Sequence, residues 1–318
     1  MDQSLVLQIQ NRFPEINIKT DYPLAPFTTL KIGGPADIFI QTESVSQLTR
    51  LLTFLASQNT PITILGNGSN ILISDFGLSG VVIKNTGNSI TTSESNPNHV
   101  TISSGTSLAY AINWTLDHHL TGLEYYAYIP ATIGGAVYSH IHGVENHQFS
   151  QILNTVIVFN LKKRKVENLQ ATALKWAYDY SQLQDEPHLV ILSAKFNLIP
   201  GNPQKAKQFA KDIIDQKSSV QPLNSAGSVF KNPTPKDCLP LWGETKSAGW
   251  IIEHELNLKG YSLGDAQIGP QHANIFTNQD KATASDFYRL IRLVQDQSLK
   301  KLGLPLQLEI QLLGQFKD

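Results

Sequence analysis

Three glycine-containing segments in the first half of the chain constrain its fold more than any other feature. They read "TTLKIGGPADIFI" at residues 28–40, "LGNGSNILIS" at residues 65–74 and "IPATIGGAVY" at residues 129–138. Glycine lacks a Cβ, so it accepts positive φ angles and lets a second backbone or a flat ligand approach closely. Each segment is therefore either a tight packing point or a place where a ligand lies on the main chain. Together they favour one elongated ligand with phosphates and a planar ring, such as a dinucleotide.

The second segment has the composition of an anion-binding turn. Gly66 and Gly68 permit positive φ, and Ser69 and Asn70 add side-chain donors to successive backbone N–H groups, which together form a concavity for phosphate. It is not a Rossmann fingerprint, because a third glycine is missing and a strand-like run follows in place of a helix. It is not a Walker loop either, because Gly-Lys-Ser/Thr is absent. A plain tight turn is the alternative.

Periodicity predicts a mixed chain of helices and strands, and hence an α+β fold class. Apolar residues at helical spacing predict helices at residues 44–59, 107–119 and 205–217, and a long helix from Thr283 to a stop at Gly303. Ser44 followed by Gln47 is a capping-box start. Short apolar runs predict strands at residues 61–65, 80–85, 99–105, 154–161 and 188–198. The final strand, residues 306–314, alternates and puts Glu309 on its polar face.

The same pattern divides the chain into three consecutive α+β parts. Boundaries are expected near residue 85 and at the linker "PGNPQ", residues 200–204, where proline, glycine and asparagine cluster. The expected parts are residues 1–84, 85–200 and 201–303, and the last strand, within residues 304–318, is expected to pack near the active site.

Composition narrows the class of protein. With 318 residues, 41% hydrophobic, 16% charged and a net charge of -1, the chain suits a globular protein without the basic excess that nucleic acid binding needs. The basic run "LKKRK" at residues 161–165 is interpreted as a solvated hairpin tip. A single cysteine, Cys238, excludes an internal disulfide and a multi-cysteine metal site. No signal peptide or long apolar run is present, so we expect a cytoplasmic protein without a membrane partner.

The segment "SAGSVFKNP", residues 225–233, carries the strongest candidate for chemistry. Ser228 could be a nucleophile, a phosphate ligand, a proton donor or a turn residue. A nucleophile is disfavoured, because neither a Ser-His-Asp context nor a nucleophile elbow surrounds it. The residues alone leave the other three roles open.

Taken in order, these motifs resemble the UDP-N-acetylenolpyruvoylglucosamine reductase (UDP-N-acetylmuramate dehydrogenase) family. The resemblance runs through "TTLKIGGPADIFI", "ILGNGSNILISDFGLSGVVI", "GTSLAYAINWTLDHHLTGLEYYAYIPATIGGAVY", "SAGSVFKNP", "AGWIIEHELNLKGYSLGDAQIGPQHANIFTN" and "LEIQLLG". These six ordered blocks span roughly residues 24–314, which makes the resemblance specific although each block alone is weak.

The resemblance implies a flavoprotein of peptidoglycan precursor synthesis. It implies a two-part FAD-binding region of the PCMH/vanillyl-alcohol-oxidase type, residues 1–84 and 85–200, and a C-terminal α+β substrate-binding domain. Non-covalent FAD would be reduced by NADPH and pass hydride to the enolpyruvyl group of UDP-N-acetylglucosamine enolpyruvate, giving UDP-N-acetylmuramate. The partner would be this small UDP-sugar, and the protein would be a monomer. The sequence holds no motif that separates NADPH from NADH.

The resemblance also assigns roles to individual residues. Ser228 matches the proton donor, and Glu309 matches a second catalytic acid, although a strand residue like Glu309 is ordinarily just exposed. Substrate-binding positions are Tyr178, Lys217, Lys231 and Asn232. FAD-binding positions are Lys31, Gly66, Asn67, Gly68, Ser69, Asn70, Ile129, Thr132, Gly134 and Gly135.

One departure from the family pattern affects catalysis. The family carries a Tyr-Arg-x-Ser motif whose arginine polarises the substrate carboxylate, whereas this chain has Asp179 at that position, between Tyr178 and Tyr180. Electrophilic assistance of this kind is commonly worth about 10²–10³ in rate. Either another cation has taken over the role, or catalysis is impaired. In the second case the chain would be a flavoprotein for another substrate or a pseudoenzyme that binds UDP-sugar and FAD.

A second departure is the segment "SHIHGVENHQF", residues 139–149, where the family has Asn-Ala-Gly-Ala-Tyr-Gly. Its histidines, His140, His142 and His147, lack the spacing and the cysteine of a known metal site, so we expect no metal. The favoured interpretation is that one histidine hydrogen-bonds substrate or flavin. That it also takes over the cationic role lost at Asp179 is a hypothesis, which unchanged turnover of His142→Ala would remove for His142. Ala131 replaces a usual glycine, which requires a negative φ there. No tyrosine-containing loop over the substrate is found, which indicates the loop-lacking subtype.

Overall fold

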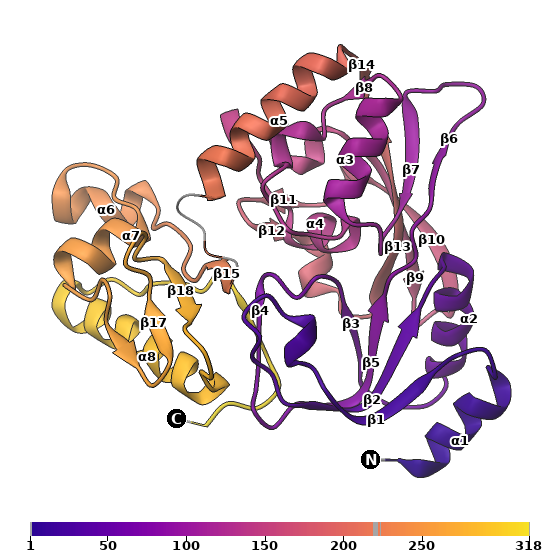
Figure 1. Ribbon diagram of the computed structural model, residues 1–318, viewed down its shortest axis with the longest axis horizontal. Coiled ribbons are helices and arrows are strands. Elements are labelled where there is room, and N and C mark those ends of the chain that lie inside the picture. The colour runs from indigo at the N-terminus through magenta and orange to yellow at the C-terminus, as the bar shows by residue number, and fades with distance from the viewer. Residues whose placement is uncertain (1, 219–221, 223, 318) are drawn as a thin grey trace. The chain divides into compact units, whose positions relative to one another are not determined.

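The computed structural model describes residues 2–218, 222 and 224–317, and its helices and strands confirm the α+β class (Figure 1). Packing groups the chain into two compact units. The first comprises Met1–Thr20, Ile38–Asn67 and Gly80–Lys217, and the second comprises Asp21–Asp37, Gly68–Ser79 and Ser218–Asp318. Because the chain passes between the units after residues 20, 37, 67, 79 and 217, neither unit is a continuous stretch of sequence.

This grouping differs from the three consecutive parts expected from sequence. Helix α5 (Pro203–Ser218) follows the predicted linker but packs in the first unit. Its Ala206 belongs to the core of that unit, and the ring of Phe209 lies 5.2 Å from that of Tyr125. The boundary found by packing therefore falls after residue 217 and not near residue 201, because the linker leads into a helix that folds back. The functional roles of the three parts stay predictions.

The first sheet is built from strands early in the chain. Its order is β1–β2–β5–β3, with β1 at Ile18–Pro23, β2 at Pro35–Thr42, β5 at Leu78–Asn85 and β3 at Ile62–Leu65. Helix α1 (Gln3–Arg12) comes before it, and helix α2 (Val45–Leu55) shares a hydrophobic core with its strands. The Oγ of Ser44 accepts from the N–H of Gln47 at 3.1 Å, which confirms the predicted helix start.

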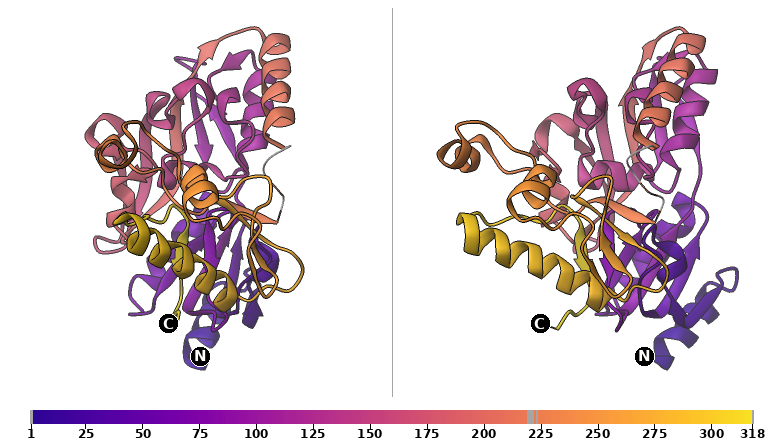
Figure 2. Two further views of the ribbon diagram at one scale, coloured as in Figure 1. Left: turned by 90° about the vertical axis from the view of Figure 1, so that its left-hand side faces the viewer. Right: turned by 60° about the vertical axis from the view of Figure 1, so that its left-hand side comes forward.

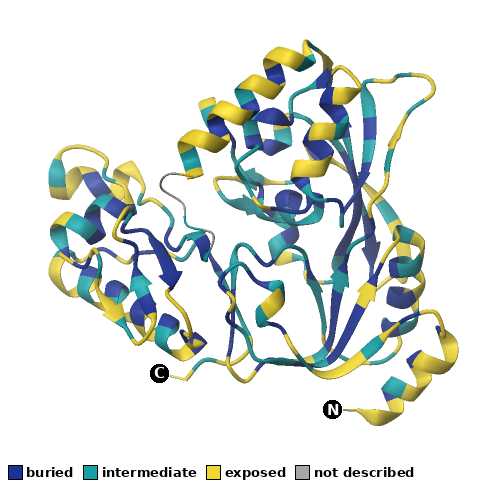
Figure 3. Ribbon diagram, in the orientation of Figure 1, coloured by how far each residue is buried: buried dark blue, intermediate teal, exposed yellow. Residues whose placement is uncertain are grey.

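A larger antiparallel sheet lies in the first unit. Its order is β10–β9–β13–β7–β6, with β10 at Lys165–Gln170, β9 at Leu153–Asn160, β13 at Leu189–Asn197, β7 at His99–Ser103 and β6 at Ile90–Thr92. The central strands β9 and β13 are mostly buried (Figure 3). Helices α3 (Leu108–Asp117) and α4 (Ile133–Ser139) contribute to the same core. The basic run lies at the β9–β10 turn, where Lys163 and Lys165 pair with Glu167, so the hairpin-tip prediction is confirmed.

Short elements complete the first unit. Strands β11 (Trp176–Ala177) and β12 (Tyr180–Ser181) form a hairpin, and β8 (Leu120–Thr121) pairs with β14 (Ile199–Pro200). Short 3-10 helices are η2 (Glu124–Tyr126), η3 (Val144–Asn146), η4 (Phe149–Gln151), η5 (Ala171–Ala173) and η6 (Gln182–Asp185).

The second unit has its own antiparallel sheet, of order β15–β18–β17–β16. The strands are β15 (Ser225–Ser228), β18 (Ile275–Asn278), β17 (Ala266–Ile268) and β16 (Ser262–Leu263). Helix α8 (Ala284–Leu302) packs against β16 and β17, as the views of Figure 2 show in yellow and orange. The remaining elements are η1 (Ala25–Phe27), α6 (Pro235–Trp242), α7 (Ala248–Trp250), the π-helical turn η7 (Ile251–Glu255), and the parallel pair β4 (Ile71–Ile73) and β19 (Gln311–Leu313).

Helix α8 begins and ends where the sequence predicts. Thr283 is its N-cap and accepts from the N–H of Asp286 at 3.0 Å, and Gly303 ends it with a φ of 66°. Asp75, far away in sequence, also accepts from the N–H groups of Ala284 and Ser285, each at 2.8 Å.

The predicted final strand is shorter than expected. Only Gln311–Leu313 form a strand, whereas residues 306–310 are irregular. The segment changes partners: Leu308 bridges Phe230, and Gln311 pairs with Ile71 of β4. Because two different neighbours hold its two halves, a single alternating strand over residues 306–314 was wrong.

Candidate active site

Ser228 is the last residue of β15 and follows a β-bulge. Ser225 pairs with Thr277 and Ser228 with Ile275, so the register shifts between them. Gly227 adopts a φ of 73°, which a side chain would disfavour. Bulges of this kind turn a side chain out of the regular alternation of a strand. The glycine of "SAGS" therefore sets the direction of Ser228, which is half-buried.

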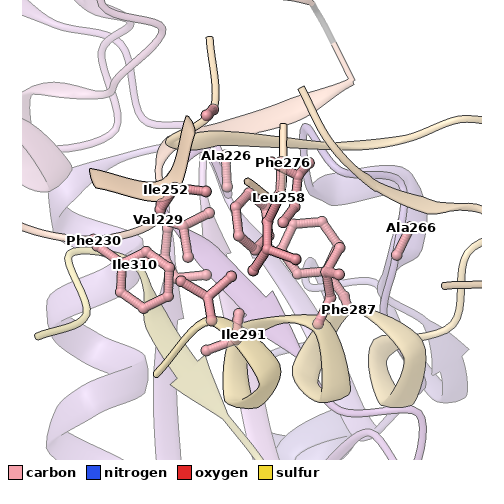
Figure 4. Close-up of a cluster of buried hydrophobic side chains, with 14 of the residues drawn as sticks. Ala226, Val229, Phe230, Ile252, Leu258, Ala266, Phe276, Phe287, Ile291 and Ile310 are labelled. Carbon is pink, nitrogen blue, oxygen red and sulfur yellow. The ribbon is translucent and has the colours of Figure 1, made fainter. Parts of the chain in front are cut away.

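Asn274 holds the segment directly after Ser228. Its Nδ2 donates to the carbonyl of Phe230 at 2.8 Å, and its Oδ1 accepts from the N–H of Phe230 at 3.0 Å. The N–H of Val229 donates to the carbonyl of Asn274 at 2.8 Å. Val229 and Phe230 point into the core beside Ile310 (Figure 4). Sequence reasoning missed Asn274, because a buried asparagine that replaces strand hydrogen bonds has no local signature.

Glu309 lies beside Ser228 in the same unit. Its N–H donates to the carbonyl of Val229 at 2.9 Å, and the N–H of Lys231 donates to the carbonyl of Gln307 at 2.8 Å. These two bonds pair the segment after Ser228 with the segment before Glu309 in antiparallel orientation. The structure thus brings the two predicted catalytic residues onto adjacent segments, and Glu309 is also half-buried.

Asn70 supports the segment that carries Glu309. Its Nδ2 donates to the carbonyl of Glu309 at 3.3 Å, and its own carbonyl accepts from the N–H of Gln311 at 3.0 Å. Asn70 was predicted to bind cofactor phosphate, and the structure gives its side chain this positioning contact. The half-buried Ser69 lies next to it.

The other two predicted substrate ligands of the second unit differ in exposure. The side chain of Asn232 is exposed, and its Oδ1 accepts from the N–H of Ala248 at 2.9 Å, at the start of α7. Lys231 is half-buried. Their substrate contacts stay predictions.

The glycine-rich loop is tightly packed at both of its glycines. A Cβ on Gly68, whose φ is 64°, would lie 2.2 Å from the carbonyl oxygen of Phe27. A Cβ on Gly66 would lie 2.7 Å from the Oγ1 of Thr132. Asn67 donates from Nδ2 to the carbonyl of Pro130 at 3.2 Å. The loop is therefore the tight turn that the sequence offered as one alternative, and its binding of an anion stays a prediction.

Lys84 is a further residue at this loop that the sequence did not single out. Its Nζ donates to the carbonyl of Gly66. Burial lowers the pKa of the Lys84 ammonium. This bond satisfies the Gly66 carbonyl with a partly buried ammonium.

The start of α4 carries Thr132, Gly134 and Gly135, which were predicted to contact flavin. The Oγ1 of Thr132 accepts from the N–H of Gly135 at 3.2 Å. Gly134 packs against Ser104, where a Cβ would lie 2.9 Å from the Cβ of Ser104. At Gly135 the nearest atom to an added Cβ is the Oγ1 of Thr132 at 3.4 Å, so a side-chain carbon would fit at Gly135 but not at Gly134.

Three further residues predicted to lie at or near the flavin differ in their surroundings: Ala131, Ile129 and Lys31. Ala131 is not among the residues with positive φ, which meets the condition set for a methyl group there. Ile129 is half-buried against the core of the first unit. Lys31 is exposed, has a φ of 57°, and donates from Nζ to the carbonyl of Pro26 at 3.3 Å.

His140 and His147 have internal partners. The Nδ1–H of His140 donates to the carbonyl of Ala177 at 2.6 Å, and its Nε2 lies 2.9 Å from the Oγ of Ser150. Only 3% of His140 is exposed, and this burial lowers its pKa. The ring of His147 stacks on that of Tyr125 at 3.5 Å.

His142 is the histidine that meets Asp179. Its Nδ1 lies 2.9 Å from the Oδ1 of Asp179, and the side chains are 41% and 11% exposed. A carboxylate only accepts hydrogen bonds, so Nδ1 carries the proton of this bond. Asp179 lies in the two-residue turn of the β11–β12 hairpin with a φ of 49°, a conformation that aspartate tolerates.

Aromatic contacts join this pair to two predicted substrate residues. The ring of Tyr178 lies 4.8 Å from that of His142. The hydroxyl of Tyr128 donates to the carbonyl of His142 at 3.2 Å, and the ammonium of Lys217 lies 5.3 Å from the centre of the Tyr128 ring. These contacts bring together five residues of the first unit, which we call the His142 cluster: Tyr128, His142, Tyr178, Asp179 and Lys217.

The described residues hold neither a metal-binding cluster nor a helix that could cross a membrane. Across residues 2–218, 222 and 224–317, no group of three histidine, cysteine or acidic side chains is arranged to hold a metal ion. Over the same residues, every helix is too short or too polar to span a bilayer.

Family models match both ends of the chain. Residues 36–161 match the model of an FAD binding domain, and residues 218–313 match that of the C-terminal domain of UDP-N-acetylenolpyruvoylglucosamine reductase. The second match begins where packing places the start of the last segment of the second unit.

Similar proteins cover the whole chain. A UDP-N-acetylenolpyruvoylglucosamine reductase of Pediococcus pentosaceus is 33% identical over 319 residues and covers 100% of both chains. One of Synechococcus is 35% identical and covers 95% of this chain and 93% of its own. The crystal structure of the reductase from Thermus caldophilus aligns with a TM-score of 0.74 at 29% identity, over 94% of this chain and 99% of that one.

Proposed function

Because the chain belongs to the family of UDP-N-acetylenolpyruvoylglucosamine reductases, we propose that it reduces UDP-N-acetylglucosamine enolpyruvate to UDP-N-acetylmuramate with FAD and NADPH. It is a flavin-dependent oxidoreductase of peptidoglycan precursor synthesis. The observation that carries the proposal is the placement of Ser228 and Glu309 on adjacent, hydrogen-bonded segments of the second unit.

Reduction of the enolpyruvyl double bond adds a hydride to one carbon and a proton to the other. The hydride would come from reduced FAD when it is bound. The Ser228 hydroxyl supplies the proton to the adjacent carbon, and the serine regains a proton from solvent. A serine is a weak acid, so it must be held close to the carbon where negative charge develops. The bulge at Gly227 and the clamp by Asn274 provide that fixed position.

Glu309 acts as the second acid at the same place. Its backbone is held by Val229 and Asn70, so its position is tied to that of Ser228. A carboxyl group there donates a hydrogen bond to the substrate as charge develops on the enolpyruvyl group. Lys231, Asn232, Tyr178 and Lys217 bind the UDP-sugar.

The residues present fit FAD. The turn at Gly66–Gly68, where a side chain in place of either glycine would clash, would hold the pyrophosphate with the side chains of Asn67, Ser69 and Asn70. The flavin would be bound by Ile129, Thr132, Gly134 and Gly135. Lys31 adds an exposed cation. FAD is held without a covalent bond.

A stopped-flow experiment tests the function. The yellow protein is reduced anaerobically with NADPH and mixed with UDP-N-acetylglucosamine enolpyruvate, while the flavin absorbance is followed. Rapid reoxidation with formation of the lactyl ether is expected. If the flavin stays reduced although substrate binds, the chain is a pseudoenzyme or acts on another substrate, and Asp179 is the first residue to change.

The same proposal includes location and assembly. The enzyme acts in the cytoplasm, where NADPH and UDP-sugars are made, with the UDP-sugar as its partner and without nucleic acid. It acts as a monomer, and light scattering of the purified holoenzyme checks this state.

A further inference from the structure

We propose that His142, held by Asp179, binds the carboxylate of the enolpyruvyl group and so replaces the missing arginine. This inference rests on the proposed function, because it names a contact to that substrate. His142 would be a catalytic residue that touches substrate, and Asp179 would be a positioning residue that acts through it.

Contacts single out His142 among the three histidines of residues 139–149. His140 is buried and uses both ring nitrogens on Ala177 and Ser150. His147 lies flat on Tyr125. His142 is 41% exposed, and within the described part of the chain its Nε2 has no hydrogen-bond partner. Of the three, it is therefore the one whose Nδ1 is held by a carboxylate while Nε2 is left to meet a ligand.

Asp179 fixes how this ring is presented. Because its carboxylate accepts from Nδ1–H, the other ring nitrogen, Nε2, is the one left to meet a ligand. A ring protonated on both nitrogens then donates one N–H to Asp179 and the other to a second carboxylate. An aspartate that would repel a substrate anion by itself becomes useful when a histidine lies between the two.

The hairpin that carries Asp179 is firmly attached. The Oγ of Ser181 donates to the carbonyl of Tyr138 at 2.5 Å, and the Nε2 of Gln184 donates to the same carbonyl at 3.0 Å and to that of Asp179 at 3.3 Å. His140 ties the other side of the hairpin through Ala177. The loop of His142 and the turn of Asp179 are thus held to each other at several points, as a preorganised contact requires.

The charge of the His142 cluster suits an anionic ligand. Lys217 lies over Tyr128, whose hydroxyl holds the carbonyl of His142. Tyr128 thus links the backbone of His142 to the ammonium of Lys217. The cations of His142 and Lys217 both come from the first unit, which carries the predicted positions Tyr178 and Lys217.

Binding of two matched ligands tests this contact. UDP-N-acetylmuramate carries a carboxylate on its lactyl ether, whereas UDP-N-acetylglucosamine lacks it. His142→Gln is expected to weaken binding of UDP-N-acetylmuramate about 10- to 100-fold, the range for a lost hydrogen bond between charged groups, and to change binding of UDP-N-acetylglucosamine less than about twofold. Calorimetric titration of the holoenzyme measures both dissociation constants.

Three further variants sharpen the test. His142→Arg restores a cation and is expected to recover most of the affinity for UDP-N-acetylmuramate. Asp179→Asn keeps an acceptor of similar shape but not the charge, and is expected to weaken the same ligand alone. His147→Gln, in the same loop, is the matched control and is expected to leave both constants unchanged. The flavin spectrum of each variant shows whether it has folded with FAD.

The outcomes separate this inference from the proposed function. If the wild-type enzyme turns over its substrate but His142→Gln binds both ligands as the wild type does, the inference is overturned and the function stands. Equal weakening of both ligands, without rescue by His142→Arg, also overturns it. If the wild-type enzyme fails to reoxidise with the enolpyruvyl substrate, the proposed function fails first, on its own experiment.

Discussion

Ser228 and Glu309 sit on segments whose backbones hydrogen-bond to each other, so each side chain can be changed while the pairing is kept. In the His142 cluster the contact to Asp179 is between side chains and is lost on substitution, but the hairpin stays held through Ser181 and Gln184. Substitutions at these positions therefore report on chemistry more than on folding.

Ser228→Ala is expected to remove the proton donor. Flavin reduction by NADPH should proceed as in the wild type, whereas reoxidation by the enolpyruvyl substrate should slow about 10²–10⁴-fold, the usual contribution of a positioned acid. Stopped-flow absorbance measures both half-reactions. Ser225→Ala is the control, since Ser225 lies in the same strand but its Oγ donates to the carbonyl of Pro222. Wild-type reoxidation in Ser228→Ala would show that another group donates the proton.

His140 predicts a loss of stability in acid. Burial lowers the pKa of its ring, so the folded protein binds this proton less readily than the unfolded chain does. The stability that the neutral ring contributes is fully present above the unfolded value of about 6.5 and is lost as the pH falls below it.

The measurement is the melting temperature of the holoenzyme at about pH 7.5 and about pH 5.5, on either side of the ordinary histidine range. His140→Gln is expected to lose less melting temperature between the two than the wild type. His118→Gln, which removes a histidine stacked on Trp114, is the control and should follow the wild type. An equal loss in all three proteins would remove His140 as the cause.

Among the elements, helix α8 depends on a cap that comes from a distant part of the second unit. The carboxylate of Asp75 accepts from two backbone N–H groups and the hydroxyl of Ser285. Its negative charge also suits the N-terminal end of a helix. Local sequence supplies only Thr283 for this end.

Asp75→Ala is therefore expected to destabilise the second unit by about 0.5–2 kcal/mol, the usual range for a lost N-cap. Denaturant unfolding followed by circular dichroism measures it. Asp296→Ala is the comparison, since Asp296 lies within α8, exposed and paired with Arg292 at 3.6 Å, and should change stability by less than about 0.5 kcal/mol. Equal effects of the two changes would contradict the special role of Asp75.

Helices and caps were predictable because their signals are local. Ser44, Thr283 and Gly303 each mark a helix end through the residues beside them. The irregular segment before β19 could not be predicted in this way, because the partners of this part of the chain, Phe230 and Ile71, are far away in sequence. In the site, Ser228 and Glu309 were predicted by resemblance. The sequence could not predict the roles of Asn274 and Lys84 or the choice of His142, because these depend on which groups folding brings close together.

For the whole molecule, the two-unit organisation follows from the same long-range contacts. The core of the second unit contains Leu30, Ile32 and Leu72 from the first quarter of the chain as well as residues after 225. Strand β19 pairs with β4, and Asn278 donates from Nδ2 to the carbonyl of Leu30 at 2.9 Å. The C-terminal hundred or so residues are thus only part of a folding unit.

A fragment of residues 218–318 is therefore expected not to fold by itself, although a family model matches almost the same range. It would leave the apolar surface around Phe230 and Ile310 without Leu30, Ile32 and Leu72, and helix α8 without the Asp75 cap. Limited chymotrypsin digestion and thermal circular dichroism check this: the fragment should be cut rapidly and melt without a cooperative transition, whereas the full chain resists and melts sharply. A fragment that unfolds cooperatively would mean that the early segments only cover a core that the later residues build alone.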